Sequence, residues 1–390
     1  MTTTKKIIRK LHLWLGLSSG IIIVFLGITG CILAFQTEIE SLQSFRHVLP
    51  QEKAFLPPSA LKETAVSLLP GKNLHSVLYG SKEDAAQMIF FNLAPKYYFI
   101  IFMDPYTGNV LKVKNMDNDF FRIMINGHYY LWLPPNIGQP IATTATLIFV
   151  IMMISGLILW WPRNKHARKQ RFTIKWNAKW KRKNYDLHYV LGFYITWISI
   201  FVALSGMVMG FQWFAKSVYW ASSGGKSLVD FYEPVSEKPA VASAAFSPED
   251  KVWKYMNRSY PDAETIEVHY AENDSMAVAA GANPDAGTYW KTDYRYFDQY
   301  TLKEIPVTHV YGRYTTATIA DKMARMNYDI HTGQVLGLPG KIMAFLASLI
   351  AASLPITGFY IWWGRKKKKK RLPVAAVAEH PIPHLQYEKA

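Results

Sequence analysis

The chain alternates between long apolar segments and long polar segments. Four segments are apolar over a length that can cross a bilayer, and none of them contains Asp, Glu, Lys or Arg. A membrane-spanning helix needs about 20 mainly apolar residues, each adding about 1.5 Å to its length. The sequence therefore predicts four transmembrane helices, over residues 13–35, 140–161, 188–211 and 342–363.

Two large polar blocks, residues 36–139 and 212–341, separate these spans. Each block contains strand-like segments with β-branched and aromatic residues, and one helical segment. A turn with Pro and Gly at suitable positions, Asp104–Gly108, joins two of the strands. We therefore expect each block to form its own small α+β module. The predicted strands are 87–92, 97–103, 109–113 and 294–305, and the predicted helices are 56–69 and 248–260.

Positive charge is concentrated in the tail 1–12, the loop 162–187 and the tail 364–390. Lysine and arginine next to membrane spans mark the cytoplasmic side. This places both termini and the middle loop in the cytoplasm and both polar blocks in the periplasm, for a protein of the inner membrane. The formal net charge of +16 thus reflects topology, and it favours contact with lipid head groups over nucleic-acid binding.

One unit of sequence occurs twice, and it carries matched histidines. His12 begins the first span and His188 the third, and Phe-Gln follows each histidine at the same distance. His128 and His331 precede the Trp-Trp pairs that end the second and fourth spans, at nearly equal intervals. Both halves run in the same direction, so we predict two parallel repeats related by an axis along the membrane normal.

The four matched histidines suggest axial ligands for haem. The predicted orientation pairs His12 with His188 at the cytoplasmic end and His128 with His331 on the periplasmic side. Each pair can place one imidazole on either side of a ring, and bis-histidine iron favours electron transfer because no coordination position is open. A lone histidine at a membrane interface is more often a snorkelling or hydrogen-bonded residue. The occurrence of four histidines at matched positions argues against this alternative explanation.

Glycines also recur at matched positions on the face of the histidines, namely Gly16 and Gly30 in the first span and Gly192 and Gly206 in the third. One explanation is close packing of helices in lipid, which small residues permit. The other is that they leave room for a flat macrocycle, and we assign these four glycines to cofactor binding on that basis. Every span carries a Ser/Thr-Gly pair, namely Thr29-Gly30, Ser155-Gly156, Ser205-Gly206 and Thr357-Gly358.

Several function classes lack their motifs. The sequence has no dinucleotide fingerprint, no phosphate-binding loop and no hydrolase elbow. Cys31 is its single cysteine, so no iron–sulfur cluster is indicated. Charged groups within the membrane are usual in ion-coupled transporters, and these spans have none. Because the sequence has no motif for binding a flavin or nicotinamide cofactor, electrons must come from a partner protein or from quinol. The remaining histidines are expected to be solvated or on the surface, namely His47, His75, His166, His269, His309, His380 and His384.

These features resemble the PepSY-associated transmembrane family over roughly residues 5–370. The resemblance rests on the hairpin that begins at Asp104-Pro105, on the His-x-x-x-Gly start of the first span, on Ser/Thr-Gly before Trp-Trp, and on the basic middle loop. Within that family the chain is similar to bacterial iron-regulated inner-membrane proteins, including ferrisiderophore reductases. The resemblance implies that the periplasmic modules are PepSY-like.

The resemblance also implies an activity. The protein would be a membrane-bound, haem-dependent reductase with b-type haem, two per chain, held by the four matched histidines. Its acceptor would be a ferric siderophore or another ferric chelate in the periplasm, and its donor quinol or a cytoplasmic reductase. Two alternatives stay open: a non-enzymatic envelope protein whose outer modules bind a peptide or protein partner, and an uptake permease for iron chelates.

Overall fold

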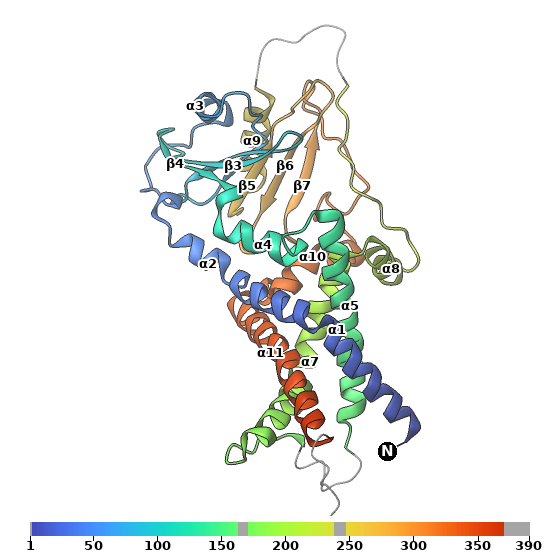
Figure 1. The fold of residues 1–390 in the computed structure, drawn as a ribbon. Helices are drawn as coiled ribbons and strands as arrows, with labels where there is room; N and C mark the ends of the chain where they lie inside the picture. Colours follow the sequence, from blue (N-terminus) through green and yellow to red (C-terminus); the bar gives the residue numbers. More distant parts are fainter. Residues whose placement is uncertain (1, 163–170, 238–246, 370–390) are drawn as a thin grey trace, which may run out of the picture.

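A bundle of four long helices forms one end of the molecule and a β-sheet forms the other (Figure 1). The computed structural model describes residues 2–162, 171–237 and 247–369. Around the bundle, α1 contacts α5 and α11, and α7 contacts the same two helices. Each long helix covers one predicted span to within two residues and extends beyond it at one end or at both. The four are α1 (Thr3–Leu33), α5 (Pro135–Trp160), α7 (Trp180–Gly210) and α11 (Gly337–Lys369).

The N-terminus and the ends of α5 and α11 lie at the end of the bundle that is remote from the sheet (Figure 1). This arrangement brings the described parts of the three basic segments to one end of the molecule. Residues 163–170 and 370–390, which include His166, His380 and His384, lie outside the described residues.

The two polar blocks build one antiparallel sheet of seven strands, in the order β4-β3-β2-β1-β5-β6-β7. The expectation of a separate module for each block is therefore wrong. The two blocks join where β1 pairs with β5, with Val77 opposite Val268. The strands are β1 (Ser76–Tyr79), β2 (Ala86–Leu93), β3 (Lys96–Met103), β4 (Val110–Asn115), β5 (Thr265–His269), β6 (Val278–Asn283) and β7 (Asp293–Phe297).

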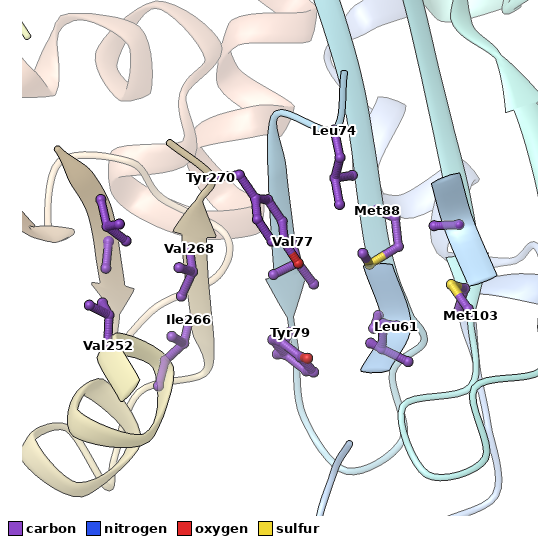
Figure 2. Packing of buried hydrophobic residues seen from close by; sticks show 14 of the residues in the cluster. Leu61, Leu74, Val77, Tyr79, Met88, Met103, Val252, Ile266, Val268 and Tyr270 are labelled. Carbon is purple, nitrogen blue, oxygen red and sulfur yellow. The ribbon is translucent and has the colours of Figure 1, made fainter. Parts of the chain in front are cut away.

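One apolar core unites the blocks on one face of this sheet. Helices α3 (Pro58–Leu68) and α9 (Pro248–Ser259) cover that face, close to their predicted positions. Leu61 and Val77 from the first block and Val268 from the second are completely buried in the same cluster (Figure 2). Neither block could bury these side chains alone, because the cluster takes residues from both. The predicted strand 294–305 ends at Phe297, and only a bridge between Phe297 and Glu304 continues it.

Short helices connect the sheet to the bundle. Pro134 and Pro135 break the chain between His128 and the second span, and His128 accordingly lies on a separate short helix, α4. Two of the short helices end with a left-handed residue, α4 at Leu131 and α10 at Gly333, and each carries a matched histidine in its last turn. The short elements are α2 (Gln36–Ser41), α4 (Phe120–Tyr130), α8 (Gln212–Ser222), α10 (Ile319–Thr332) and the 3-10 turns Ser44–Arg46, Met116–Asn118 and Gln334–Leu336.

Candidate functional site

Each matched histidine uses Nδ1 to contact a Ser/Thr-Gly pair of a neighbouring long helix. The partner helix always belongs to the same half of the chain as the histidine. The contacts are His12 Nδ1 to Ser155 Oγ at 2.8 Å, His128 Nδ1 to Thr29 Oγ1 at 2.9 Å, His188 Nδ1 to Thr357 Oγ1 at 2.9 Å, and His331 Nδ1 to Ser205 Oγ at 3.4 Å.

The surrounding hydrogen bonds determine which ring nitrogen carries the proton. The Nδ1 atoms of His188 and His331 also lie 3.1 Å and 2.8 Å from backbone carbonyl oxygens, which only accept. The hydroxyls of Ser155 and Thr29 donate to carbonyls of their own helices. They must therefore accept from the histidines. All four imidazoles thus carry the proton on Nδ1, and Nε2 keeps the lone pair that a metal ion needs.

The glycine of each pair lies against the imidazole. A Cβ atom built on Gly206 or Gly358 would crowd Cε1 of the bonded histidine, whereas one built on Gly30 would make only an ordinary contact with it. Gly206 therefore makes room for an imidazole, and both Gly30 and Gly206 line the cavity described below. The separations would be 3.6 Å from Gly30 to His128, 3.4 Å from Gly156 to His12, 3.0 Å from Gly206 to His331 and 3.2 Å from Gly358 to His188.

The other two predicted glycines contact ordinary side chains. A Cβ on Gly16 would lie 2.8 Å from Cε of Met152, and one on Gly192 would lie 3.6 Å from Cδ2 of Leu354. The helix-packing explanation therefore fits Gly16 and Gly192 better than the macrocycle explanation.

The structure brings His128 and His331 together from the two halves. Their ring centroids are 6.0 Å apart and the planes are inclined by 62°. Two imidazoles bound through nitrogen on opposite sides of one metal ion, at about 2.0–2.1 Å each, would have centroids about 6 Å apart. Burial, and next the neighbouring His331, lowers the pKa of His128 to about 3, and burial lowers that of His331. Both rings are therefore neutral, as ligands must be.

These two histidines line a cavity of about 610 Å³, a volume typical of ligand and cofactor pockets. Small residues of the bundle, including Gly30, Gly206 and Ala347, form part of its wall. Arg122 and Tyr289 line it as well, and these residues come from α4 and from the loop before β7. An apolar slot with two ligand nitrogens and a cation fits a haem, whose ring is apolar and whose propionates are anionic.

The two histidines of the predicted inner pair, His12 and His188, lie close enough to interact electrostatically, and each has Nδ1 held as described above. They do not line the cavity of His128 and His331. The four histidines thus form an inner and an outer pair, and each pair takes one histidine from each half.

Sequence reasoning did not single out Arg122. Its guanidinium carbon lies 5.2 Å from the centroid of the Tyr98 ring, and its side chain lines the cavity. Its position could have indicated a role, because Arg122 lies six residues before His128 on the same short helix, which begins at the N-cap residue Asp119. Two sheet tyrosines differ in their surroundings, because Tyr97 is buried in the sheet core whereas Tyr294 lines the cavity.

One predicted surface histidine is buried. His309 is 4% exposed and packs against the rings of Phe231, Tyr232 and Tyr296. The rings around His309 come from segments that are far apart in the sequence, so the sequence near His309 does not indicate that it is buried.

Four long apolar helices define a multi-pass membrane protein. A family model described as the PepSY-associated TM region matches residues 9–365. The chain therefore belongs to the PepSY-associated transmembrane family. A comparison with curated proteins finds no match.

Proposed function

We propose that this protein is a di-haem electron carrier of the bacterial inner membrane that reduces a ferric siderophore or a similar ferric chelate in the periplasm. The observation that carries the proposal is the outer pair, His128 and His331. Their Nδ1 atoms are both hydrogen-bonded to the protein, and their ring centroids lie 6.0 Å apart, so both imidazoles could hold one haem iron. Haem b, when bound, supplies an iron that gains and loses one electron.

Hydrogen bonds to the surrounding residues orient each histidine for binding iron. A metal-binding histidine usually donates the N–H group of its second ring nitrogen to an oxygen. This hydrogen bond fixes the orientation of the ring and makes the ligand nitrogen more basic. Thr29 and the carbonyl of Val202 do this for the outer pair, and Ser155 and Thr357 for the inner pair. The apolar walls limit the access of water to the outer site.

The two pairs lie at different depths of the bundle. His12 and Gly30, which lies against His128, are on the same helix α1 and are separated by about five helical turns. That separation corresponds to about 27 Å along a helix, close to the roughly 30 Å thickness of the hydrocarbon core. Two haems at these levels would relay electrons from a quinol or a cytoplasmic reductase to the outer face.

Residues near the outer pair support an anionic acceptor. Arg122 makes no ion pair in the described part of the chain, and it lies over Tyr98 at the cavity. Tyr289, Tyr294 and Tyr311 line the same cavity. A cation among aromatic rings suits a chelate that is both charged and partly apolar.

The decisive measurement is haem per chain, by the pyridine haemochrome method, in protein purified after haem-replete expression. We expect two haems per chain. His128→Ala and His331→Ala should each remove the same haem, and His12→Ala and His188→Ala the other. His47→Ala, outside both pairs, should keep both.

A protein without haem would overturn the proposal. So would a fully reduced protein that a ferric chelate does not reoxidise under anaerobic conditions. If all four histidine variants also kept their biological activity, the partner-binding alternative would replace it.

A further inference from the structure

A second pair of histidines meets at the centre of the sheet, where the two halves join. His75 immediately precedes β1 and His269 ends β5. Nε2 of His75 lies 3.3 Å from Nδ1 of His269, and the rings are perpendicular. Phe91 of β2 packs edge-on against His75. Both imidazoles are therefore held by neighbouring central strands.

A carboxylate lies beside the opposite nitrogen of each ring. Oε1 of Glu272 is 3.4 Å from Nδ1 of His75, and Oε1 of Glu267 is 3.7 Å from Nε2 of His269. A neutral imidazole has one N–H group, and the adjacent carboxylate attracts it. The two nitrogens that face each other then both carry lone pairs, which repel. A cation between them would bind both lone pairs and remove this repulsion.

We propose that Nε2 of His75 and Nδ1 of His269 bind one divalent transition-metal ion of the imidazole-preferring class, such as Zn²⁺. Two nitrogens bound at about 2.0–2.1 Å in tetrahedral geometry lie about 3.3–3.4 Å apart, which matches the observed separation. Glu267 and Glu272 would act as the outer partners that orient metal-binding histidines. Imidazole suits zinc, copper, nickel and ferrous iron, whereas oxygen ligands suit harder ions.

The site is open on its remaining sides. Among the described residues, no three His, Cys, Asp or Glu side chains are grouped to enclose a metal ion. Two protein ligands would leave positions for water or for donor atoms of a bound molecule. The side chains of His75 and His269 are 32% and 35% exposed, so an ion can reach them from solvent.

A shared proton is the alternative to a metal ion. It would either make one of the rings a cation or turn a lone pair toward a carboxylate, Glu272 at His75 or Glu267 at His269. A metal ion would bind both lone pairs while both rings stay neutral.

The site uses neither haem-binding pair, so it does not depend on the proposed function. It lies near the cavity all the same. The ring of Phe91 contacts that of Tyr98, and Arg122 lies over Tyr98 and lines the cavity. A metal ion here would occupy the face of the sheet that is opposite to α3 and α9.

The test is equilibrium dialysis of the full-length protein in detergent against Zn²⁺, with bound metal measured by mass spectrometry. We expect His75→Ala and His269→Ala each to remove one Zn²⁺ per chain, and the double variant to remove no more. Glu272→Gln should weaken that site about 10–100-fold. The control is His47→Ala, because His47 also lies near a carboxylate, Asp84, but has no described second imidazole beside it.

Cu²⁺ bound to the unaltered protein gives a readout that needs no variant to fold. Its electron paramagnetic resonance spectrum should show coupling to two imidazole nitrogens. Equal zinc binding by all variants, or independent partial losses that add in the double variant, would refute the site. A copper spectrum without nitrogen coupling would do the same.

Discussion

A Cβ atom on Gly206 would lie 3.0 Å from Cε1 of His331, closer than nearly all real Cβ contacts. The ring fills the space that the missing side chain leaves on α7. The neighbouring hydroxyl of Ser205 and the carbonyl of Val202 then hold Nδ1. Residues within one turn of a membrane helix thus determine both the position and the tautomer of this imidazole, and a Ser or Thr hydroxyl on Nδ1 recurs at the other three histidines.

Gly206→Ala should displace this imidazole. The added methyl group cannot move, because it is attached to the helix backbone, so the ring must shift or the helices must separate. We expect a loss of about 1–3 kcal/mol in stability, the usual cost of overpacking, together with reduced haem content at the outer site.

The matched control is Gly192→Ala, on the same helix. Its new methyl group would meet only Leu354 at 3.6 Å, an ordinary contact. Thermal unfolding and haem content of both variants check the prediction. Equal behaviour of the two would contradict the seating role of Gly206.

The hydroxyl of Thr29 should matter for cofactor affinity more than for folding. Thr29→Val keeps the shape of the side chain and removes the acceptor that lies 2.9 Å from Nδ1 of His128. Loss of such a partner typically weakens metal binding about 10–100-fold. Thr29→Ser keeps the hydroxyl and should bind haem as the wild type does. Haem titration of the two apo-proteins distinguishes them, and equal affinities would show that the hydroxyl does not tune the ligand.

The spans and the four histidines could be predicted because their signals are local or repeated. An uncharged apolar run long enough to cross a bilayer has few possible structures, and the interval from His12 to Phe-Gln recurs after His188. The short helix that carries His128 was also predictable, because two prolines break the chain behind it. The pairing of histidines across the halves followed from charge orientation.

The single sheet could not be predicted from these patterns. Its joining strand β1 is very short, and its partner β5 lies in the other half of the chain, beyond two membrane spans. β1 is too short to show a clear alternation of apolar and polar positions, and the alternation in β5 does not reveal which strand it pairs with. The role of Gly30 and Gly206 was likewise hidden, because a glycine that faces a macrocycle and one that faces an imidazole look the same in a sequence.

A half-buried pair of hydrogen bonds should add to the union of the two halves. Asp250 at the start of α9 accepts from the backbone N–H and the hydroxyl of Ser59 on α3, at 2.8 Å and 2.6 Å. Hydrogen bonds to a charged group contribute about 1.5–3 kcal/mol. Asp250→Ala should therefore lower the free energy of unfolding of the sheet domain by about 1–3 kcal/mol.

A double-mutant cycle with Ser59→Ala isolates this contact. The double variant should be less destabilised than the sum of the two single variants, because the hydroxyl contact can be lost only once. Additive effects in chemical denaturation would show that the two side chains act independently.

Arg325 should be indispensable for the position of α10. Its guanidinium is buried at 6% exposure and donates to three backbone carbonyls, those of Val310, Thr292 and Gly312, at 2.6 Å, 3.1 Å and 2.7 Å. Arg325→Met would fill much of the same space but leave the carbonyls of Val310 and Thr292 without this donor, whereas Gly312 keeps the backbone N–H of Tyr294 at 3.3 Å. Each unsatisfied buried group costs about 1–3 kcal/mol, so a total of at least about 2 kcal/mol is expected.

The same substitution should reach the outer pair, because Arg325 and His331 lie on one helix and line one cavity. Haem loss should therefore accompany destabilisation in Arg325→Met, whereas Arg258→Met, at an exposed position of α9, should alter neither. Thermal unfolding combined with haem content measures both effects. A stable Arg325→Met protein with full haem content would show that the loop carbonyls find other donors and that α10 is held by its apolar contacts alone.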